Sequence, residues 1–192
     1  MGDKQYKLFS AVGSTPQAFA NSISWFLVAH ERQYPVSDVY FIATNENKAH
    51  GIAGTSQNIK PAIDMVRKSL QIMAPHLVGK VRMHEQPAAI IPEEDIPEAL
   101  VGVVQGVRSI VPDETGCIID MTAGRKTMSA ALALACHVLK HKFKKNVLLS
   151  YYWLIRWTKE SLEKKAHELG IDDIASMVFD LDKLDEVVKG IK

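Results

Sequence analysis

The residues able to carry chemistry gather in two short segments, each of which follows an apolar run. The first segment is Gly13-Ser14-Thr15-Pro16. Its small residue lets the backbone approach an anion, its hydroxyls can donate hydrogen bonds, and a helix starting after it would add N–H groups with a partial positive charge. Taken alone, the segment fits an ordinary strand-to-helix turn, capped by Ser14 or Thr15, better than a phosphate site.

The second segment, from Asp120 to Ser129, is more informative. It joins an apolar run to an alanine-rich run of helical character, so its donors converge at a helix N-terminus. Gly124 permits a conformation that other residues resist. Positive charge comes from Arg125 and Lys126, and hydroxyls come from Thr122, Thr127 and Ser129. The segment is not a Walker A loop, which needs adjacent Gly-Lys and an earlier glycine.

Asp120 could be a base, a metal ligand or a brace for its own loop. We favour the brace, because no histidine or second carboxylate lies in the segment. His137 and His141 have the spacing of neighbours on a helix, but no acid or cysteine lies between them, which favours a surface pair over a metal site. No metal and no cofactor are therefore expected.

A further cluster holds aromatic residues and an arginine near the end of a later apolar run. Core packing and stacking on nucleobases are equally good interpretations of it. The cluster consists of Tyr151, Tyr152, Trp153, Arg156 and Trp157.

Apolar runs and helical periods alternate along almost the whole chain. This alternation predicts an α/β fold: a Rossmann-like, doubly wound, mostly parallel sheet of about six strands with helices on both faces. Strands are predicted at 6–12, 38–44, 78–84, 116–121 and 146–153, helices at 16–32, 59–73, 96–110, 127–143 and 159–169, loops at 45–55 and 86–93, and one more strand and a short helix after residue 175. Ligands of such sheets bind beyond the carboxyl ends of the strands, where the strand order reverses.

Composition narrows the function further. The chain has 192 residues, 23 basic and 22 acidic, with a net charge of +1. This balance argues against a DNA coat or a membrane-surface protein, and so against long DNA or RNA and membranes as partners, but it permits a small anionic ligand. Cys117 and Cys136 lie in apolar runs and form no CxxC pair, as expected of buried thiols in a reducing cytosol. We found no signal peptide or membrane-spanning run, so a cytoplasmic location is expected.

The segment GST-P-Q at 13–17, together with D-x-T-A-G-R-K-x-M-S at 120–129, resembles the CARF family of CRISPR-associated Rossmann-fold domains. These domains sense cyclic oligoadenylates in type III CRISPR defence. The resemblance covers about the first 155 residues and implies a single domain over 1–192, with a core at 5–155 and a C-terminal extension at 156–192. One departure is Ala123-Gly124, where the family often has two glycines.

The resemblance also implies a function. Too little chain follows the sheet for a typical nuclease domain, which points to a stand-alone ring nuclease that cuts cyclic tetra-adenylate without a metal and switches the defence off. The alternative is a non-catalytic sensor acting through a partner protein; a more distant one is an unrelated nucleotide-binding domain. Hexa-adenylate has the same two-fold symmetry, which matches the cleft of a homodimer. The implied catalytic residues are Lys126 and Ser14, and the implied ligand-binding residues are Gly13, Thr15, Thr44, Asn45, Thr122, Ala123, Gly124, Arg125 and Thr127.

Overall fold

A computed structural model describes residues 5–46, 51, 53–124, 126–155 and 158–183. The fold is built on one seven-stranded sheet with the order β3-β2-β1-β5-β6-β7, and β4 pairs separately with β2. The described pairings are parallel except that of β6 with β7. The strands are β1 (Tyr6–Ala11), β2 (Val36–Thr44), β3 (Arg82–Met83), β4 (Ala89–Ile91), β5 (Gly116–Asp120), β6 (Val147–Leu154) and β7 (Ile174–Asp180).

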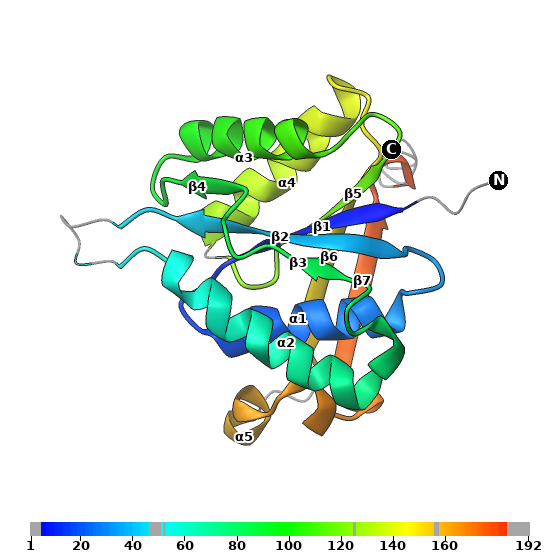
Figure 1. The fold of residues 1–192 in the computed structure, drawn as a ribbon. Coiled ribbons are helices and arrows are strands. Elements are labelled where there is room, and N and C mark those ends of the chain that lie inside the picture. Colours follow the sequence, from blue (N-terminus) through cyan, green and yellow to red (C-terminus); the bar gives the residue numbers. More distant parts are fainter. Residues whose placement is uncertain (1–4, 47–50, 52, 125, 156–157, 184–192) are drawn as a thin grey trace, which may run out of the picture.

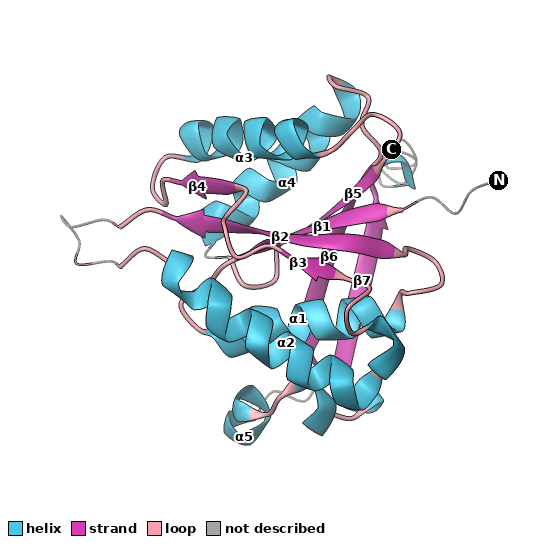
Figure 2. Ribbon diagram, in the orientation of Figure 1, coloured by secondary structure: helices cyan, strands magenta, loops and turns pink. Residues whose placement is uncertain are grey.

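Helices cover both faces of this sheet. Helices α1 and α2 lie on one face, and α3 and α4 lie on the other (Figure 1; Figure 2). The predicted Rossmann-like, doubly wound α/β fold is therefore confirmed, with one strand more than expected. The helices are α1 (Pro16–Ala29), α2 (Ile59–Met73), α3 (Ile96–Ile110), α4 (Lys126–His141) and the short α5 (Lys159–Glu163). No helix among the described residues is both long and apolar enough to cross a bilayer.

The central strands are apolar on both sides because both sides are covered. Leu8 and Phe9 are neighbours in β1 and both are 0% exposed. Leu8 belongs to the core under α1 and α2, whereas Phe9 belongs to the core under α3 and α4. Such strands read as continuous apolar runs rather than alternating ones, which is why β1 and β5 could be recognised from the sequence.

Helices α2 and α3 have the predicted bounds. In α2, Ile63 and Val66 are buried while Asp64 and Arg67 are exposed, as expected of an amphipathic surface helix. Asp95 caps α3, because its Oδ1 accepts a hydrogen bond of 2.9 Å from the Glu98 N–H.

Helix α1 departs from its prediction at both ends. It ends at Ala29, three residues before the expected Arg32, and the chain turns there with the Gln33 and Tyr34 N–H groups donating to the His30 carbonyl. Thr15 holds the N-cap position in an extended conformation, but its side chain makes no capping hydrogen bond. Pro16 begins the helix, and its missing N–H costs nothing at that position.

Two predictions for short elements were wrong. The expected loop at 86–93 contains β4, because Ile91 is fully buried and pairs beside Thr44 of β2. The expected helix at 159–169 ends at Glu163 as α5. Lys164 is extended, and its carbonyl accepts a 2.9 Å hydrogen bond from Asn21 Nδ2 of α1. A tertiary contact therefore overrides the helical pattern at that point.

Candidate ligand site at the carboxyl edge of the sheet

The loops after β1 and β5 meet at the carboxyl edge of the sheet. Ser10 of β1 lies beside Asp120 of β5, and the strand order reverses between these two strands. A methyl group at Gly13 would lie 2.4 Å from the carbonyl oxygen of Ala123, so the two loop backbones are in direct contact. Two segments far apart in the sequence therefore form one continuous surface.

Asp120 braces this surface from below. Its Oδ2 accepts hydrogen bonds from Ser10 Oγ at 3.0 Å and Ser22 Oγ at 2.9 Å. Its Oδ1 accepts from the Thr122 N–H at 3.1 Å and from Thr122 Oγ1 at 2.5 Å. Burial raises the pKa of the Asp120 carboxyl, and the hydrogen bonds from Thr122, Ser22 and Ser10 act against that rise. These contacts confirm the interpretation of Asp120 as a brace.

Further hydrogen bonds fix the β5 loop to its surroundings. Thr122 Oγ1 accepts a hydrogen bond of 2.9 Å from the Tyr152 N–H, which joins the loop to β6. Ser129 Oγ, in the first turn of α4, donates at 3.2 Å to the carbonyls of both Met121 and Gly124. The loop is thus held at both ends by side chains that the sequence offered only as possible ligand contacts.

Gly124 does not use the conformational freedom that glycine permits. Among the described residues, positive φ angles occur at Gly51, Gly79 and Lys144 and not at Gly124. The reason for a small residue is crowding instead, because a methyl group there would lie 3.1 Å from Met128 Sδ and from Ser129 Oγ.

The loop after β2 supports the site more than it lines it. The Thr44 side chain is 3% exposed, and its Oγ1 and N–H both donate to Thr55 Oγ1, at 3.3 and 2.9 Å. Asn45 is exposed and its N–H donates to the Ile91 carbonyl. Sequence reasoning missed Asn58, just before α2, whose Nδ2 donates at 2.9 Å to the Gly13 carbonyl.

The groups left free to meet a ligand lie on the outer side of the joined loops. Ser14, Thr15 and Lys126 are exposed, and Thr127 is half-buried. Lys126 begins α4, where the helix dipole adds to its positive charge. Arg125, also predicted to bind the ligand, lies outside the described residues.

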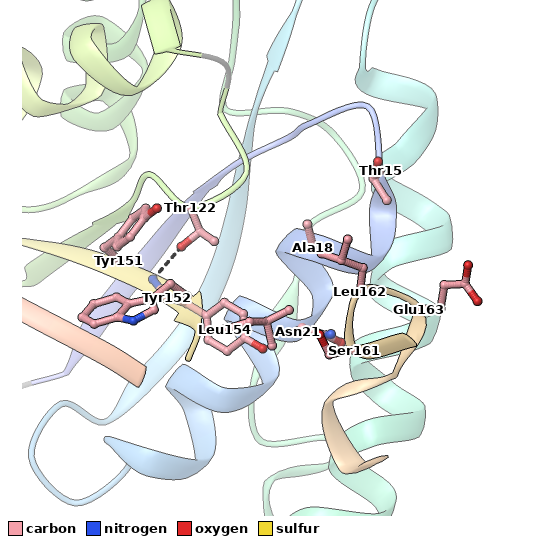
Figure 3. Close-up of a pocket in the computed structure, with 11 residues that line it drawn as sticks. Thr15, Ala18, Asn21, Thr122, Tyr151, Tyr152, Leu154, Ser161, Leu162 and Glu163 are labelled. Atoms are coloured by element: carbon pink, nitrogen blue, oxygen red, sulfur yellow. Dashed lines mark hydrogen bonds between the residues drawn. The ribbon is translucent and has the colours of Figure 1, made fainter. Parts of the chain in front are cut away.

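A cleft of about 820 Å³ opens directly beside these loops (Figure 3). It lies between the first turns of α1, the carboxyl end of β6 and α5. Thr15 and Thr122 are the two predicted site residues among those lining it. The other lining residues are Ala18, Asn21, Tyr151, Tyr152, Trp153, Leu154, Ser161, Leu162 and Glu163.

Core packing and base stacking, the two interpretations of the aromatic cluster, apply to different residues of it. Tyr152 is 6% exposed and packs with Trp25 and Ala166 in a small core, whereas Tyr151 is 37% exposed and Trp153 is half-buried. All three line the cleft. Arg156 and Trp157 lie outside the described residues. The α5 wall was missed because the segment was predicted only as part of a helix at 159–169, with no role at the site.

Cysteine and histidine residues form no second site in the described part of the chain. Cys117 and Cys136 are buried and free, and burial raises the pKa of the Cys117 thiol to about 12. The rings of His137 and His141 lie 4.3 Å apart between centroids. No group of three or more His, Cys, Asp or Glu side chains is gathered as a metal would need, for the residues that are described.

Comparison with known proteins reveals a likeness of fold alone. No protein-family model matches this chain, and no curated protein matches its sequence. Among solved structures, Csm6 of Enterococcus italicus bound to cyclic hexa-2'-fluoro-hexa-dAMP superposes with a TM-score of 0.56 at 12% identity. The match covers 98% of this chain and 46% of that chain.

A second solved structure matches more weakly. Can2 of Sulfobacillus thermosulfidooxidans in complex with cyclic tetra-adenylate has a TM-score of 0.41 at 12% identity, covering 77% of this chain and 32% of that chain. This chain spans less than half the length of either protein. The first match supports the Rossmann-like architecture; the second is too weak to add to it.

Proposed function

We propose that this chain binds a cyclic oligoadenylate, most readily cyclic tetra-adenylate, on the joined loops after β1 and β5, and cuts the ring without a metal. The observation that carries the proposal is the backbone contact between Gly13 and Ala123 at the point where the strand order reverses. The contact brings Ser14 and Lys126, which come from distant segments, to one edge of the sheet. Hydroxyls and a cation at a helix N-terminus suit a phosphodiester.

The class of ligand is supported from two independent sides. The two loop sequences resemble the CARF family, and the fold resembles that of a Csm6 structure whose ligand is a cyclic hexa-adenylate analogue. A two-fold ring matches a two-fold homodimer in which each subunit contacts half of the ligand. The dimer is accordingly part of the proposal.

The proposed reaction uses a nucleophile that belongs to the ligand. A ribose 2'-OH attacks the neighbouring phosphorus in line, loses its proton and displaces the 5'-oxygen, which takes up a proton. Each cut leaves a 2',3'-cyclic phosphate and a 5'-OH, and two cuts give linear di-adenylate. The protein orients the phosphate through Ser14 and offsets its negative charge through Lys126 and the loop N–H groups.

One observation favours the alternative, a sensor that binds the ring without cutting it. Asp120 is the carboxyl group nearest the loops in sequence, and its two oxygens already accept four hydrogen bonds in a fully buried position. It is therefore not placed to act as a general base. The enzyme is expected to turn over slowly, and a sensor would need the same surface.

The test is a single-turnover reaction with purified protein in excess over cyclic tetra-adenylate, in EDTA, resolved by chromatography and mass. We expect linear di-adenylate ending in a 2',3'-cyclic phosphate. Lys126→Ala and Ser14→Ala should each slow the cut on the order of 100-fold. Lys68→Ala, which removes an exposed lysine from α2, is the matched control and should have no effect.

A ring carrying 2'-fluorine in place of 2'-OH has no nucleophile and should be bound but recovered whole. Intact tetra-adenylate recovered from a tight complex would establish the sensor instead. No binding of the tetra- or hexa-adenylate ring would overturn the proposal.

A further inference from the structure

The cleft beside the joined loops shares residues with them. Thr15 belongs to the β1 loop and Thr122 to the β5 loop, and both line the cleft. A phosphate held on the loops therefore has the cleft as its immediate neighbour. The nucleoside attached to that phosphate is the part of a ligand that can reach the cleft.

The joined loops and the cleft differ in charge. The loop side carries Lys126 and the N-terminus of α4, whereas Glu163 of α5 is the charged residue among the described residues that line the cleft. The Glu163 carboxylate points away from the other lining side chains (Figure 3), so the described lining presents neutral groups to a ligand. The remaining lining includes the apolar side chains of Ala18, Leu154 and Leu162, which suits the flat, weakly polar faces of a base.

The third wall of the cleft is held in place from α1. Asn21 Nδ2 donates at 2.9 Å to the Lys164 carbonyl, and Trp25 Nε1 donates at 3.1 Å to the Ala166 carbonyl. Thr158 and Ser161 cap α5 reciprocally, with bonds of 3.0 and 2.9 Å. Leu162 is 45% exposed on this anchored wall, so an apolar side chain is kept beside an open cleft.

The Tyr152 hydroxyl, on the wall formed by β6, is buried without a hydrogen-bond partner among the described residues. Leaving such a group unpaired costs about 1–3 kcal/mol. A base with ring nitrogens and an amine offers partners for it if the base enters deeply. Figure 3 shows Tyr152 between Thr122 and Asn21, at the inner side of the cleft.

We infer that the cleft between α1, β6 and α5 is a subsite for one adenine base, and that the C-terminal segment carrying α5 is a binding wall. This inference rests on the proposed function, because it assigns a place to one base of the proposed ring. Its binding energy comes from contact between the base and the apolar wall rather than from charge.

The test measures the affinity of cyclic tetra-adenylate by calorimetry for four variants. Ala18→Phe fills the cleft from an exposed position of α1, and we expect about a 10- to 100-fold loss, the usual worth of one stacked base. Leu162→Ala should cost about 5-fold. Gln105→Phe and Leu134→Ala make the same kinds of change at exposed positions of α3 and α4 and should leave the affinity unchanged.

A second probe, AMP, separates this inference from the proposed function. AMP should shift the methyl resonances of Leu162 and Ala18 and leave those of Leu134 unmoved. If AMP does so while the ring does not bind, the base subsite stands and the proposed function fails. If the ring binds equally to the wild type and to Ala18→Phe, and AMP moves no cleft methyl, the inference is overturned and the proposed function stands. If neither ligand binds, both are wrong.

Tyr152→Phe then decides how deeply the base enters. A loss of about 5-fold in ring affinity without a lower melting temperature would show that the base pairs with the hydroxyl. Unchanged affinity, beside a loss in Ala18→Phe, would support a base held in the outer part of the cleft.

Discussion

Gly13 and Gly124 of the candidate site face different neighbours. A methyl group at Gly13 would meet the backbone of Ala123, whereas one at Gly124 would meet the ends of the Met128 and Ser129 side chains. Backbone cannot give way as side-chain ends can, so the two positions differ in what they tolerate. Asp120 lies beneath both loops, and its buried carboxyl accepts hydrogen bonds from the hydroxyls of Ser10, Ser22 and Thr122. Its pKa in the folded protein therefore differs from its pKa in the unfolded chain.

Gly13→Ala should destabilise the protein by about 2–3 kcal/mol, because the two loops must move apart. Gly124→Ala is the matched variant, and we expect a loss of about 1 kcal/mol or less, since Met128 can change rotamer. Urea unfolding of both variants measures the difference. Equal losses would contradict the view that the Gly13–Ala123 contact is the rigid part of the site.

Asp120→Asn should change how stability depends on pH. A carboxyl whose pKa is raised by burial takes up a proton on folding, so its stabilising contribution is present at acid pH and lost as the pH rises through its folded pKa. The difference in unfolding free energy, wild type minus Asp120→Asn, should therefore fall from acid to neutral pH. Urea titrations at a series of pH values measure it.

Asp38→Asn provides a control of opposite sign. Burial tends to raise the pKa of Asp38, but hydrogen bonds from His84 and Ser37 and the charges of Arg82 and Lys7 lower it overall. Its contribution is present above the unfolded pKa and is lost as the pH falls. If the difference in unfolding free energy, wild type minus Asp120→Asn, also rises with pH, the four hydrogen-bond donors around Asp120 hold its carboxylate ionised in the folded protein.

The length and periodicity of each element decided how well the sequence predicted it. Helices α2 and α3 have long amphipathic patterns and clear ends, and β1 and β5 have continuous apolar runs, so their places could be predicted. Strand β4 has three residues and exists because β2 offers it an edge. The end of α5 is set by Asn21 of α1. An element whose bounds depend on contact with a distant part of the chain carries too little local sequence signal to be predicted.

The candidate site was predictable to a similar extent. Glycine, hydroxyls and cations after two strands indicated the joined loops, since parallel strands bring those loops to one edge. The side chains of Thr44 and Asn58 could not be assigned in the same way, because one is buried against Thr55 and the other reaches across to Gly13. The aromatic residues of β6 were offered as a base-stacking surface, but the cleft itself was not predicted, since its third wall comes from a segment that is held against α1.

Asn21→Ala should loosen the C-terminal wall without unfolding the sheet. It removes the hydrogen bond to the Lys164 carbonyl and the Asn21 Oδ1 acceptor for Gln17. We expect faster amide exchange over residues 158–169, with about 1 kcal/mol lost from global stability. Asn58→Ala, which releases the β1 loop instead, is the control. Unchanged exchange in Asn21→Ala would show that the wall is held without Asn21, by the 3.2 Å hydrogen bond from Gln17 Nε2 to the same Lys164 carbonyl and by Trp25.

Across the whole molecule, the sheet separates two ends with different roles. The carboxyl edge carries the joined loops and the cleft, and the strand starts lie at the opposite edge. Both faces between them are covered by helices (Figure 1). A ligand with two-fold symmetry can therefore be shared only by two carboxyl edges brought together.

The proposed homodimer should bind one ring per two chains. Calorimetry is expected to give a stoichiometry of half a ring per chain, and native mass spectrometry a complex of two 21.3 kDa chains with one ligand. A full ring bound by each separate chain would contradict the shared site while leaving binding itself intact.

The direction of β7 has a practical consequence for handling the protein. Because β7 runs antiparallel to β6, with Asp180 beside Leu148, the chain leaves β7 at the same edge of the sheet at which Tyr6 enters β1. An affinity tag or a surface tether at either described end therefore projects from the edge opposite the loops and the cleft. Attachment at residue 5 or at residue 183 should leave the ligand's approach unobstructed, so biosensor and solution affinities should agree.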